Sequence, residues 1–210
     1  MKILVACEES QVVTKEFRRL GHDAWSCDLQ DCSGGHPEWH IKGDIRDQLT
    51  ERYDIVIFHP VCRYIANSGV RWMHEQPGRW LKMLGGCGFF NLRHQFNSDY
   101  VATENPIPHK YAVNLIGKYD QLFQPWHFGH KKMKATCLWL KNLPPLQYTN
   151  IVGPPPKDKK QRYEWQDVWT CSPGPGREKM RSKTYIGIAK AMAEQWSNYV
   201  ENNHEIICRE

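Results

Sequence analysis

Apolar runs of strand length alternate with segments of helical periodicity in the first half of the chain. Residues 3–6 are an apolar run, residues 11–20 place apolar side chains at intervals of three and four, and residues 24–27 read as a second strand that leads to Asp28. Further runs at 54–58 and 100–103 are rich in β-branched or aromatic residues. Strands that alternate with helices predict βαβ units. We therefore expect an α/β fold with a doubly wound, mostly parallel sheet.

The second half of the chain continues this pattern and then departs from it. Residues 77–93 have helical spacing, residues 136–140 form another apolar run, and residues 183–199 predict an amphipathic helix. Between the last two, residues 144–180 contain many Pro, Gly and charged residues, which predicts a long loop. Loops of this length are typically functional or disordered.

Composition places the protein in a broad class. Of 210 residues, 40% are hydrophobic and 24% are charged, which suits one α/β domain with a substantial core. The amino-terminal apolar run is too short for a signal-peptide core, and no stretch approaches the roughly 20 apolar residues that span a bilayer. We expect a cytoplasmic protein without a membrane partner. Eight Cys without the spacing of a disulfide framework indicate free thiols, metal ligands or catalysis.

Two groups of basic residues are interleaved with aromatic residues. The first contains Arg71, Trp72, Arg79, Trp80 and Lys82, and the second contains Trp126, His127, Lys131, Lys132 and Lys134. Such groups suit phosphate contacts combined with base stacking, but a solvated basic face over core tryptophans has the same pattern. The net charge of +5 permits a polyanionic partner without establishing one.

Two segments at predicted strand ends carry groups for covalent catalysis. His59-Pro60-Val61-Cys62 follows the run at 54–58, and Thr103-Glu104-Asn105-Pro106 closes the run at 100–103. The ends of parallel strands share one edge of a sheet, where ligands bind. A thiol nucleophile and a carboxylate that assists proton transfer would therefore face the same small molecule. The alternative is a buried structural Cys62 and a salt-bridged Glu104.

Acidic residues follow the first three predicted strands. Glu8, Asp28 and Asp44 occupy these positions, where acids can hold a nucleoside cofactor through its ribose hydroxyls and base. The first turn, Cys7-Glu8-Glu9-Ser10-Gln11, lacks the glycines that a dinucleotide pyrophosphate requires, which disfavours NAD and ATP. S-adenosylmethionine is an adenosine cofactor without phosphates, so it needs no phosphate-binding turn.

These residues resemble the cytosine-5 DNA methyltransferases, especially the short phage and prophage members, over most of the chain. Pro60-Val61-Cys62 is similar to the family's Pro-Cys segment, whose thiolate adds to cytosine carbon 6. Glu104-Asn105 resembles the Glu-Asn segment that protonates or hydrogen-bonds the ring nitrogen. Lys134-Ala135-Thr136 resembles the basic strand that contacts the cytosine carbonyl, with Lys for the usual Arg. Residues 181–189 resemble the end of the short members, where a helix closes over the cofactor region.

The resemblance implies a Rossmann-like S-adenosylmethionine-dependent methyltransferase fold and methylation of cytosine carbon 5 in DNA by a phage- or bacteria-encoded enzyme. The catalytic residues that we expect are Cys62, Glu104, Asn105, Lys134 and Arg63. The cofactor-binding residues that we expect are Cys7, Glu8, Glu9, Ser10, Asp28, Leu29, Asp44, Ile45, His59, Pro60 and Thr184. Residues 1–210 would form a single domain, with 144–180 in place of a full target-recognition domain.

In this mechanism Cys62 adds to carbon 6 while Glu104 supports a proton on nitrogen 3, and Arg63 or His59 lowers the pKa of the thiol. The sequence departs from the family at three places. Cys7-Glu8-Glu9-Ser10 replaces a Phe-x-Gly-x-Gly turn, Val61 stands where a second Pro is usual, and Arg63 replaces Gln. These departures leave open a different transferred group, such as carboxymethyl, and a substrate that is duplex DNA, single-stranded DNA or a free cytosine nucleotide.

Two other interpretations remain. Cys27, Cys32, His36 and His40 have a spacing that is compatible with tetrahedral zinc, although Asp28 lies between these ligands at the proposed cofactor edge. The chain could also be a non-catalytic nucleic-acid-binding module, including a catalytically degenerate methyltransferase, in which Cys62 is merely packed. Such a module explains the aromatic residues but not the acids at successive strand ends.

Overall fold

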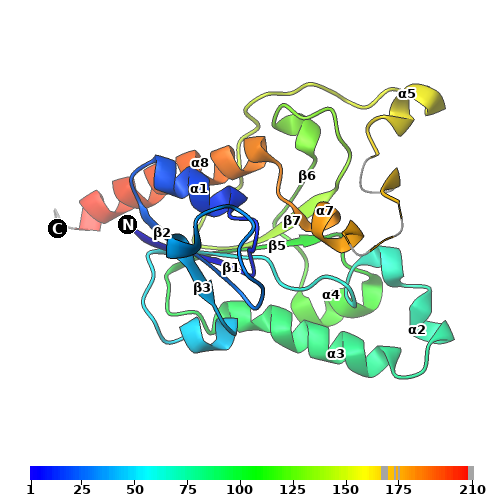
Figure 1. The fold of residues 1–210 in the computed structure, drawn as a ribbon, viewed down its shortest axis with the longest axis horizontal. Coiled ribbons are helices and arrows are strands. Elements are labelled where there is room, and N and C mark those ends of the chain that lie inside the picture. Colours follow the sequence, from blue (N-terminus) through cyan, green and yellow to red (C-terminus); the bar gives the residue numbers. More distant parts are fainter. Residues whose placement is uncertain (167–169, 173, 175, 208–210) are drawn as a thin grey trace.

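A mixed sheet lies at the centre of the computed structural model, which describes residues 1–166, 170–172, 174 and 176–207 (Figure 1). Its strands are β1 (Lys2–Ala6), β2 (Asp23–Asp28), β3 (His40–Lys42), β4 (Ile55–Phe58), β5 (Tyr100–Pro106), β6 (Gln121–Phe123) and β7 (Thr136–Lys141). They lie in the order β3-β2-β1-β4-β5-β7-β6. The strands from β1 to β5 pair in parallel, whereas β7 is antiparallel to both β5 and β6.

Helices cover both faces of this sheet (Figure 1). The helices α1 (Val12–Arg19) and α8 (Ile186–Ile207) lie on one face, and α3 (Arg79–Phe90) and α4 (Lys110–Ile116) lie on the other. Short helices α2 (Trp72–Glu75), α5 (Lys159–Tyr163) and α7 (Arg177–Ser182) lie in the connections. Five 3₁₀ turns lie among the described residues: Pro37–Trp39, Ile45–Gln48, Asn67–Gly69, Asn91–His94 and Pro125–His127.

Alternation along the strands explains why both faces are covered. Ile55 and Ile57 of β4 belong to the core cluster that also contains residues of α1 and α8. Val56 and Phe58, the alternate residues of the same strand, belong to a second cluster on the opposite face. The strand is therefore buried on both faces, as central parallel strands are. The predicted α/β architecture is confirmed, because the sheet is mostly parallel and has helices on both faces, as in a doubly wound fold (Figure 1).

Three elements differ from the sequence-based expectations. Strand β5 continues through Glu104 and Asn105, because these residues pair with Leu138 and Cys137 of β7. Helix α8 begins at Ile186, later than expected, since Lys183 has a non-helical backbone (φ −51°, ψ 132°). Strand β6 was not predicted, because three residues give too short a hydrophobic pattern.

The segment 144–180 holds more regular structure than the predicted loop. It contains α5 and the start of α7, and the buried Trp165 accepts a backbone hydrogen bond from Met133 at 2.7 Å. Residues 167–169, 173 and 175 of this segment lie outside the described residues. The segment leaves β7 at the end of the strand opposite the carboxyl edge and returns to that edge at α7 (Figure 1). In the part of the chain that the structure describes, no helix is long and apolar enough to span a bilayer.

Candidate active site at the carboxyl edge of the sheet

The expected catalytic residues come from three neighbouring strands. Cys62 follows β4, Glu104 and Asn105 lie in the last part of β5, and Lys134 precedes β7. Because β7 runs antiparallel to β5, its first residue, Thr136, pairs with Pro106 at the end of β5. The beginning of β7 therefore lies at the same edge as the ends of the parallel strands.

Glu104 is held by the histidine that follows β4. The His59 Nδ1 and Glu104 Oε2 atoms are 3.1 Å apart, and the two side chains are 12% and 13% exposed. Burial raises the pKa of Glu104, but the hydrogen bond from His59 and the positive charge of Lys134 outweigh it, so that the pKa lies below its ordinary value. Glu104 is therefore a carboxylate at neutral pH and accepts the Nδ1 hydrogen bond.

Asn105 positions the loop that carries the thiol. Its side chain is fully buried, and its Nδ2 donates to the backbone oxygen of Pro60 at 3.3 Å. The backbone of Cys62 is fixed in turn, since its oxygen accepts from the amides of Ile65 and Ala66 at 3.1 and 2.9 Å. Asn105 thus connects β5 to the cysteine loop.

The Cys62 thiol is partly buried and lies in a field of mixed charge. Burial raises the pKa of the thiol, and the negative charge of Glu104 raises it further, whereas Lys134 and Arg181 lower it. The sequence analysis expected Arg63 or His59 to lower this pKa. The structure gives that effect to Lys134 and Arg181, because Arg63 is exposed and its guanidinium lies 5.8 Å from the centre of the Tyr64 ring.

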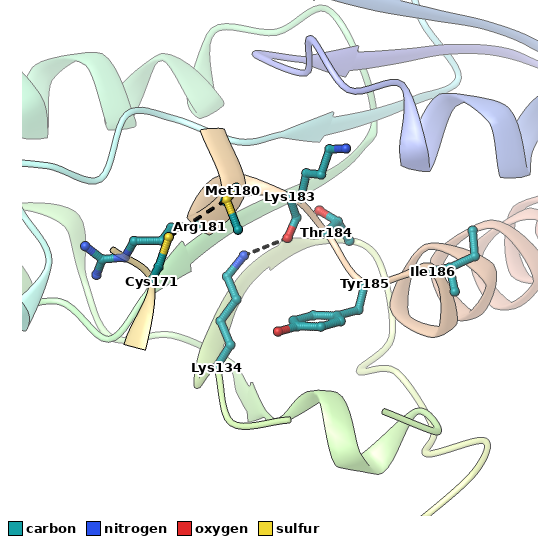
Figure 2. Close-up of a pocket in the computed structure, with 8 residues that line it drawn as sticks. All are labelled: Lys134, Cys171, Met180, Arg181, Lys183, Thr184, Tyr185 and Ile186. Atoms are coloured by element: carbon teal, nitrogen blue, oxygen red, sulfur yellow. Dashed lines mark hydrogen bonds between the residues drawn. The ribbon is translucent and has the colours of Figure 1, made fainter. Parts of the chain in front are cut away.

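Lys134 is fixed at the wall of a cavity of about 310 Å³ (Figure 2). Its Nζ donates to the backbone oxygens of Lys183 at 3.0 Å and Ser182 at 3.4 Å. Burial lowers the pKa of Lys134, and the charges of Glu104 and Cys62 act in the opposite direction. Thr184 lines both this cavity and a small adjoining one that Glu104 also lines.

Sequence reasoning missed Arg181 as a residue of this site. It lies at the cavity and acts on the pKa values of both Cys62 and Lys134. The only signal was two basic residues, Arg181 and Lys183, within a segment that resembled a cofactor region.

These charges predict opposite effects of two substitutions on the reactivity of Cys62. Lys134→Met removes a charge that lowers the thiol pKa, so the midpoint of the alkylation rate against pH should move to higher pH. Glu104→Gln removes a charge that raises the pKa, so the midpoint should move to lower pH. Peptide-resolved mass spectrometry after iodoacetamide treatment measures both, with Cys32 as the internal control. Shifts in the same direction would contradict the arrangement.

The acids of the first three strands do not all face the edge. The Glu8 carboxylate accepts from the backbone amide of Val13 at 2.7 Å, and from the amide and hydroxyl of Thr14 at 3.2 and 2.7 Å. These are donors in the first turn of α1, which otherwise lack intrahelical partners. The structure therefore places Glu8 as a capping residue of α1, with both carboxylate oxygens bonded to donors of that helix.

Asp28 and Asp44 remain at the edge, on either side of the first turn. Burial is the largest cause that raises the pKa of the Cys7 thiol, and the negative charges of Asp28 and Asp44 raise it further. The two carboxylates therefore lie near Cys7. Leu29, next to Asp28, is 71% exposed, whereas Ile45 is buried in the core and offers no surface to a ligand. Asp44 caps the turn that follows it through the amide of Arg46 at 2.9 Å.

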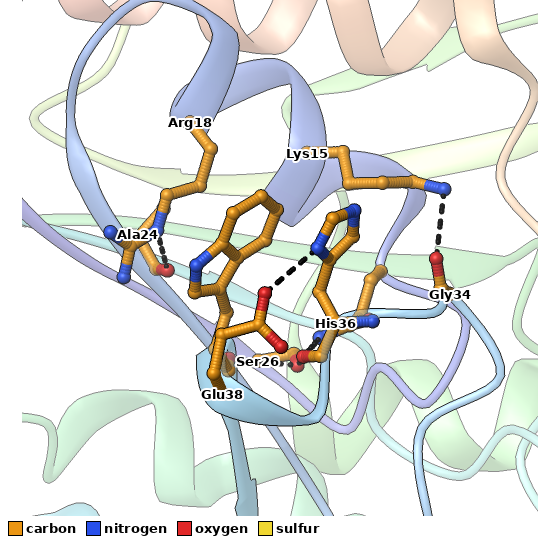
Figure 3. Close-up of polar contacts among 9 residues, drawn as sticks. Lys15, Arg18, Ala24, Ser26, Gly34, His36 and Glu38 are labelled. Carbon is orange, nitrogen blue, oxygen red and sulfur yellow. Dashed lines mark hydrogen bonds and ion pairs between the residues drawn. The ribbon is translucent and has the colours of Figure 1, made fainter.

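The first turn closes without the glycines that usually allow a left-handed backbone. Cys7 and Gln11 take that conformation instead, with φ of 60° and 56°. The buried Gln11 side chain then donates to the His36 backbone oxygen at 2.7 Å and accepts from its amide at 3.1 Å. Lys15 adds a hydrogen bond to the oxygen of Gly34 at 3.3 Å (Figure 3). The turn is therefore fixed by the loop after β2.

The zinc interpretation is not supported. His36 stacks on Trp39 and contacts Glu38 at 2.9 Å, whereas His40 lies between the Ser26 hydroxyl and a backbone oxygen. Nowhere in the described part of the chain do three or more His, Cys, Asp or Glu side chains form a group that could hold a metal.

Of the two basic and aromatic groups, the first forms a surface. Arg71 lies 4.2 Å from the centre of the Trp72 ring, and the half-exposed Trp80 packs edge-on against Tyr111. Arg79 is an exception, because it is buried and donates to the backbone oxygen of Arg63 at 3.0 Å, next to Cys62 in sequence. The second group is dispersed, since Lys132 bonds to the oxygen of Glu164 while Lys134 enters the candidate site.

No protein-family model matches the sequence, and no curated protein matches it. Among solved structures, one that is similar is a candidate DNA modification methyltransferase encoded within a prophage, from E. coli, with a TM-score of 0.45 and 13% identity over 67% of this chain and 46% of that one. An rRNA methylase from Escherichia coli has a TM-score of 0.36 and 12% identity over 66% and 56% of the two chains. The 16S rRNA methylase RmtB has a TM-score of 0.34 and 13% identity over 66% and 54%. The matched part of this chain spans about half the length of each.

Proposed function

We propose that this protein methylates carbon 5 of cytosine in DNA through a covalent adduct of Cys62, with S-adenosylmethionine as the donor. One observation carries the proposal: Cys62 after β4, Glu104 in β5 and Lys134 before β7 lie at one edge of the sheet, where Glu104 and Lys134 line the same small cavity. The charges of Glu104 and Lys134 both act on the Cys62 thiol. A nucleophile, a carboxylate and a cation at one site suit addition to an electron-poor ring that carries a basic nitrogen and a carbonyl.

The residues at the other half of the edge fit an adenosine cofactor. Asp28 is an acceptor at the end of β2, where ribose hydroxyls bind in doubly wound sheets, and the exposed Leu29 beside it offers an apolar surface for a base. Asp44 adds a further acceptor beyond the neighbouring β3. When bound there, S-adenosylmethionine would supply an electrophilic methyl group.

The protein's own residues then account for activation of the ring. The Cys62 thiolate forms a bond to carbon 6, and the electron pair of the carbon 5–carbon 6 double bond moves toward carbon 5. Nitrogen 3 takes a proton from solvent, and the ionised Glu104, held by His59, accepts a hydrogen bond from this N–H, so that the ring withdraws electrons from carbon 6. Lys134 stabilises negative charge at the carbonyl oxygen. After methylation, a solvent water or hydroxide takes the proton from carbon 5, its electron pair restores the carbon 5–carbon 6 double bond, and the Cys62 thiolate leaves. The proton on nitrogen 3 returns to solvent.

Charge and surface chemistry support a nucleic acid as the substrate. The first 60 residues contain 7 Lys and Arg against 11 Asp and Glu, whereas the remaining 150 contain 21 against 12. The basic part includes the surface formed by Arg71, Trp72 and Trp80, which suits phosphate contacts and base stacking. A cytosine in duplex DNA must leave the stack to reach Cys62.

The proposal is tested by incubating the protein with labelled S-adenosylmethionine and, separately, duplex DNA, single-stranded DNA and dCMP. Digestion to nucleosides and mass analysis should show 5-methyldeoxycytidine in at least one arm. Calorimetric titration with S-adenosylmethionine should show binding that weakens on Asp28→Asn. Binding without any modified cytosine would contradict the proposed acceptor, and absence of cofactor binding would favour a nucleic-acid-binding module.

A further inference from the structure

The cavity beside Cys62 has a strongly positive wall. Lys134, Arg181 and Lys183 all line it, and no Asp or Glu is among its described lining residues (Figure 2). Its volume of about 310 Å³ is at the lower end of the range for small-molecule sites, which is roughly 300–1,000 Å³. Glu104, which lines the small adjoining cavity, opposes the charge of Lys134. The Lys183 side chain extends away from Lys134 and Tyr185 in Figure 2. The positive charge that remains for a ligand is therefore mainly that of Arg181, which is complementary to an anion.

The charges at the carboxyl edge are sorted by strand. Asp28 and Asp44 follow β2 and β3, whereas Lys134 precedes β7, and β1, β4 and β5 separate the two groups in the sheet. S-adenosylmethionine carries a positively charged sulfonium, so we expect it to bind at the half of the edge that holds Asp28 and Asp44. The molecule over β5 and β7 should therefore be the anionic reactant.

Of the three cations, Arg181 is best suited to bind an anion. Lys134 already donates to the backbone oxygens of Ser182 and Lys183, so its ammonium is fixed. Arg181 is partly buried and forms no hydrogen bond or ion pair with another of the described residues. Its charge acts on the Cys62 thiol, so it lies near the point where the base would react. A guanidinium binds phosphate through two parallel hydrogen bonds.

We propose that Arg181 binds the 5′-phosphate of the target deoxycytidine. This inference rests on the proposed function, because it assumes that the base of the same nucleotide lies against Cys62 and Glu104. The recognised group is a nucleoside 5′-phosphate, which either a free nucleotide or a DNA strand can present.

The first experiment measures binding without a methyl donor. Calorimetry on the full-length protein should show dCMP binding about 10- to 100-fold more tightly than deoxycytidine, the range expected for hydrogen bonds to a charged group. Arg181→Gln should lower the affinity for dCMP to that of deoxycytidine and leave deoxycytidine unchanged. Arg181→Lys should keep part of the preference. Lys190→Gln, which removes an exposed charge from α8 outside the cavity, is the matched control and should bind as the unsubstituted protein does.

The second experiment distinguishes the two sources of the phosphate. A single-stranded oligonucleotide with a neutral methylphosphonate at the 5′ linkage of the target cytosine should bind the unsubstituted protein about 10- to 100-fold more weakly than the ordinary oligonucleotide. The Arg181→Gln protein should not distinguish the two. If the protein prefers dCMP to deoxycytidine but binds both oligonucleotides equally, the site recognises free nucleotides. If it also binds the methylphosphonate oligonucleotide more weakly, the site recognises the phosphate of either source.

Equal loss of dCMP and deoxycytidine binding in Arg181→Gln would overturn the inference, because the residue would then support the base or the fold. Unchanged phosphate preference with weakened S-adenosylmethionine binding would also overturn it, since Arg181 would bind a donor carboxylate. The proposed function can fail separately: a phosphate preference that depends on Arg181, without cytosine methylation, contradicts only the methyl transfer.

Discussion

Replacing Cys62 with alanine should lower the rate of cytosine methylation by at least about 1,000-fold, since removal of a covalent nucleophile typically costs several orders of magnitude. The fold should persist, because Cys62 lies in a loop after β4 and is not part of the three core clusters. Methyl transfer to the DNA or nucleotide that gives product with the unsubstituted protein measures the loss. Circular dichroism and binding of S-adenosylmethionine verify that the variant is folded.

Cys32→Ser is the matched control, because Cys32 is also a free, partly buried thiol but follows β2. It should retain nearly full activity. In addition, DNA containing 5-fluorodeoxycytidine should form a stable covalent adduct with the active protein, since the fluorine on carbon 5 cannot leave as the proton does. Peptide mapping should place that adduct on Cys62. Full activity in Cys62→Ala, or an adduct on another cysteine, would exclude the proposed mechanism.

Trp196→Ala should lower the free energy of unfolding by about 3–5 kcal/mol, the usual cost of truncating a large buried aromatic side chain. Trp196 is fully buried in the cluster that joins α8 to α1 and the sheet. Its Nε1 also donates to the backbone oxygen of Pro144 at 3.0 Å, so the side chain connects α8 to the segment after β7. Urea denaturation followed by circular dichroism measures the change.

Trp196→Phe separates packing from the hydrogen bond. The phenylalanine variant should lose less stability than the alanine variant, because a large buried ring is kept. The loss that remains reflects the smaller ring and the Pro144 oxygen, which no longer has a hydrogen-bond donor. Trp80→Ala, at a half-exposed tryptophan, should have a smaller effect than Trp196→Ala. A loss at position 196 below about 1 kcal/mol would mean that the α8 interface contributes little to stability.

Local sequence patterns were sufficient to predict most of the strands and helices. The runs at 54–58 and 100–103 became β4 and β5, because buried parallel strands are continuous apolar segments that are recognisable without knowledge of their neighbours. The reversal of β7 was not predictable in the same way. Its residues 136–140 have the same apolar character in either direction, and only pairing with β5 and β6 shows that it is antiparallel.

The candidate site was predictable where position in the chain determines position in space. Cys62, Glu104 and Lys134 lie next to strand ends or starts, so the sheet alone brings them to one edge. Glu8 also follows a strand, but its carboxylate caps α1, and the sequence does not distinguish these two orientations. Arg181 could not be placed, because its position depends on how the long connection from β7 returns across the molecule.

The connection between β7 and α8 is a place where the protein can gain residues during evolution. This connection begins at β7 and leads into α8, so the sheet and α8 hold its two ends. The helix α5, in the middle of the connection, lies well away from both (Figure 1). Loop-closure entropy grows slowly, by about 0.6 kcal/mol for each doubling of length, so extra residues can be inserted here at small thermodynamic cost. Descendants could therefore acquire a larger domain in this connection, close to the substrate cavity, without any change in the strands that carry Cys62, Glu104 and Lys134.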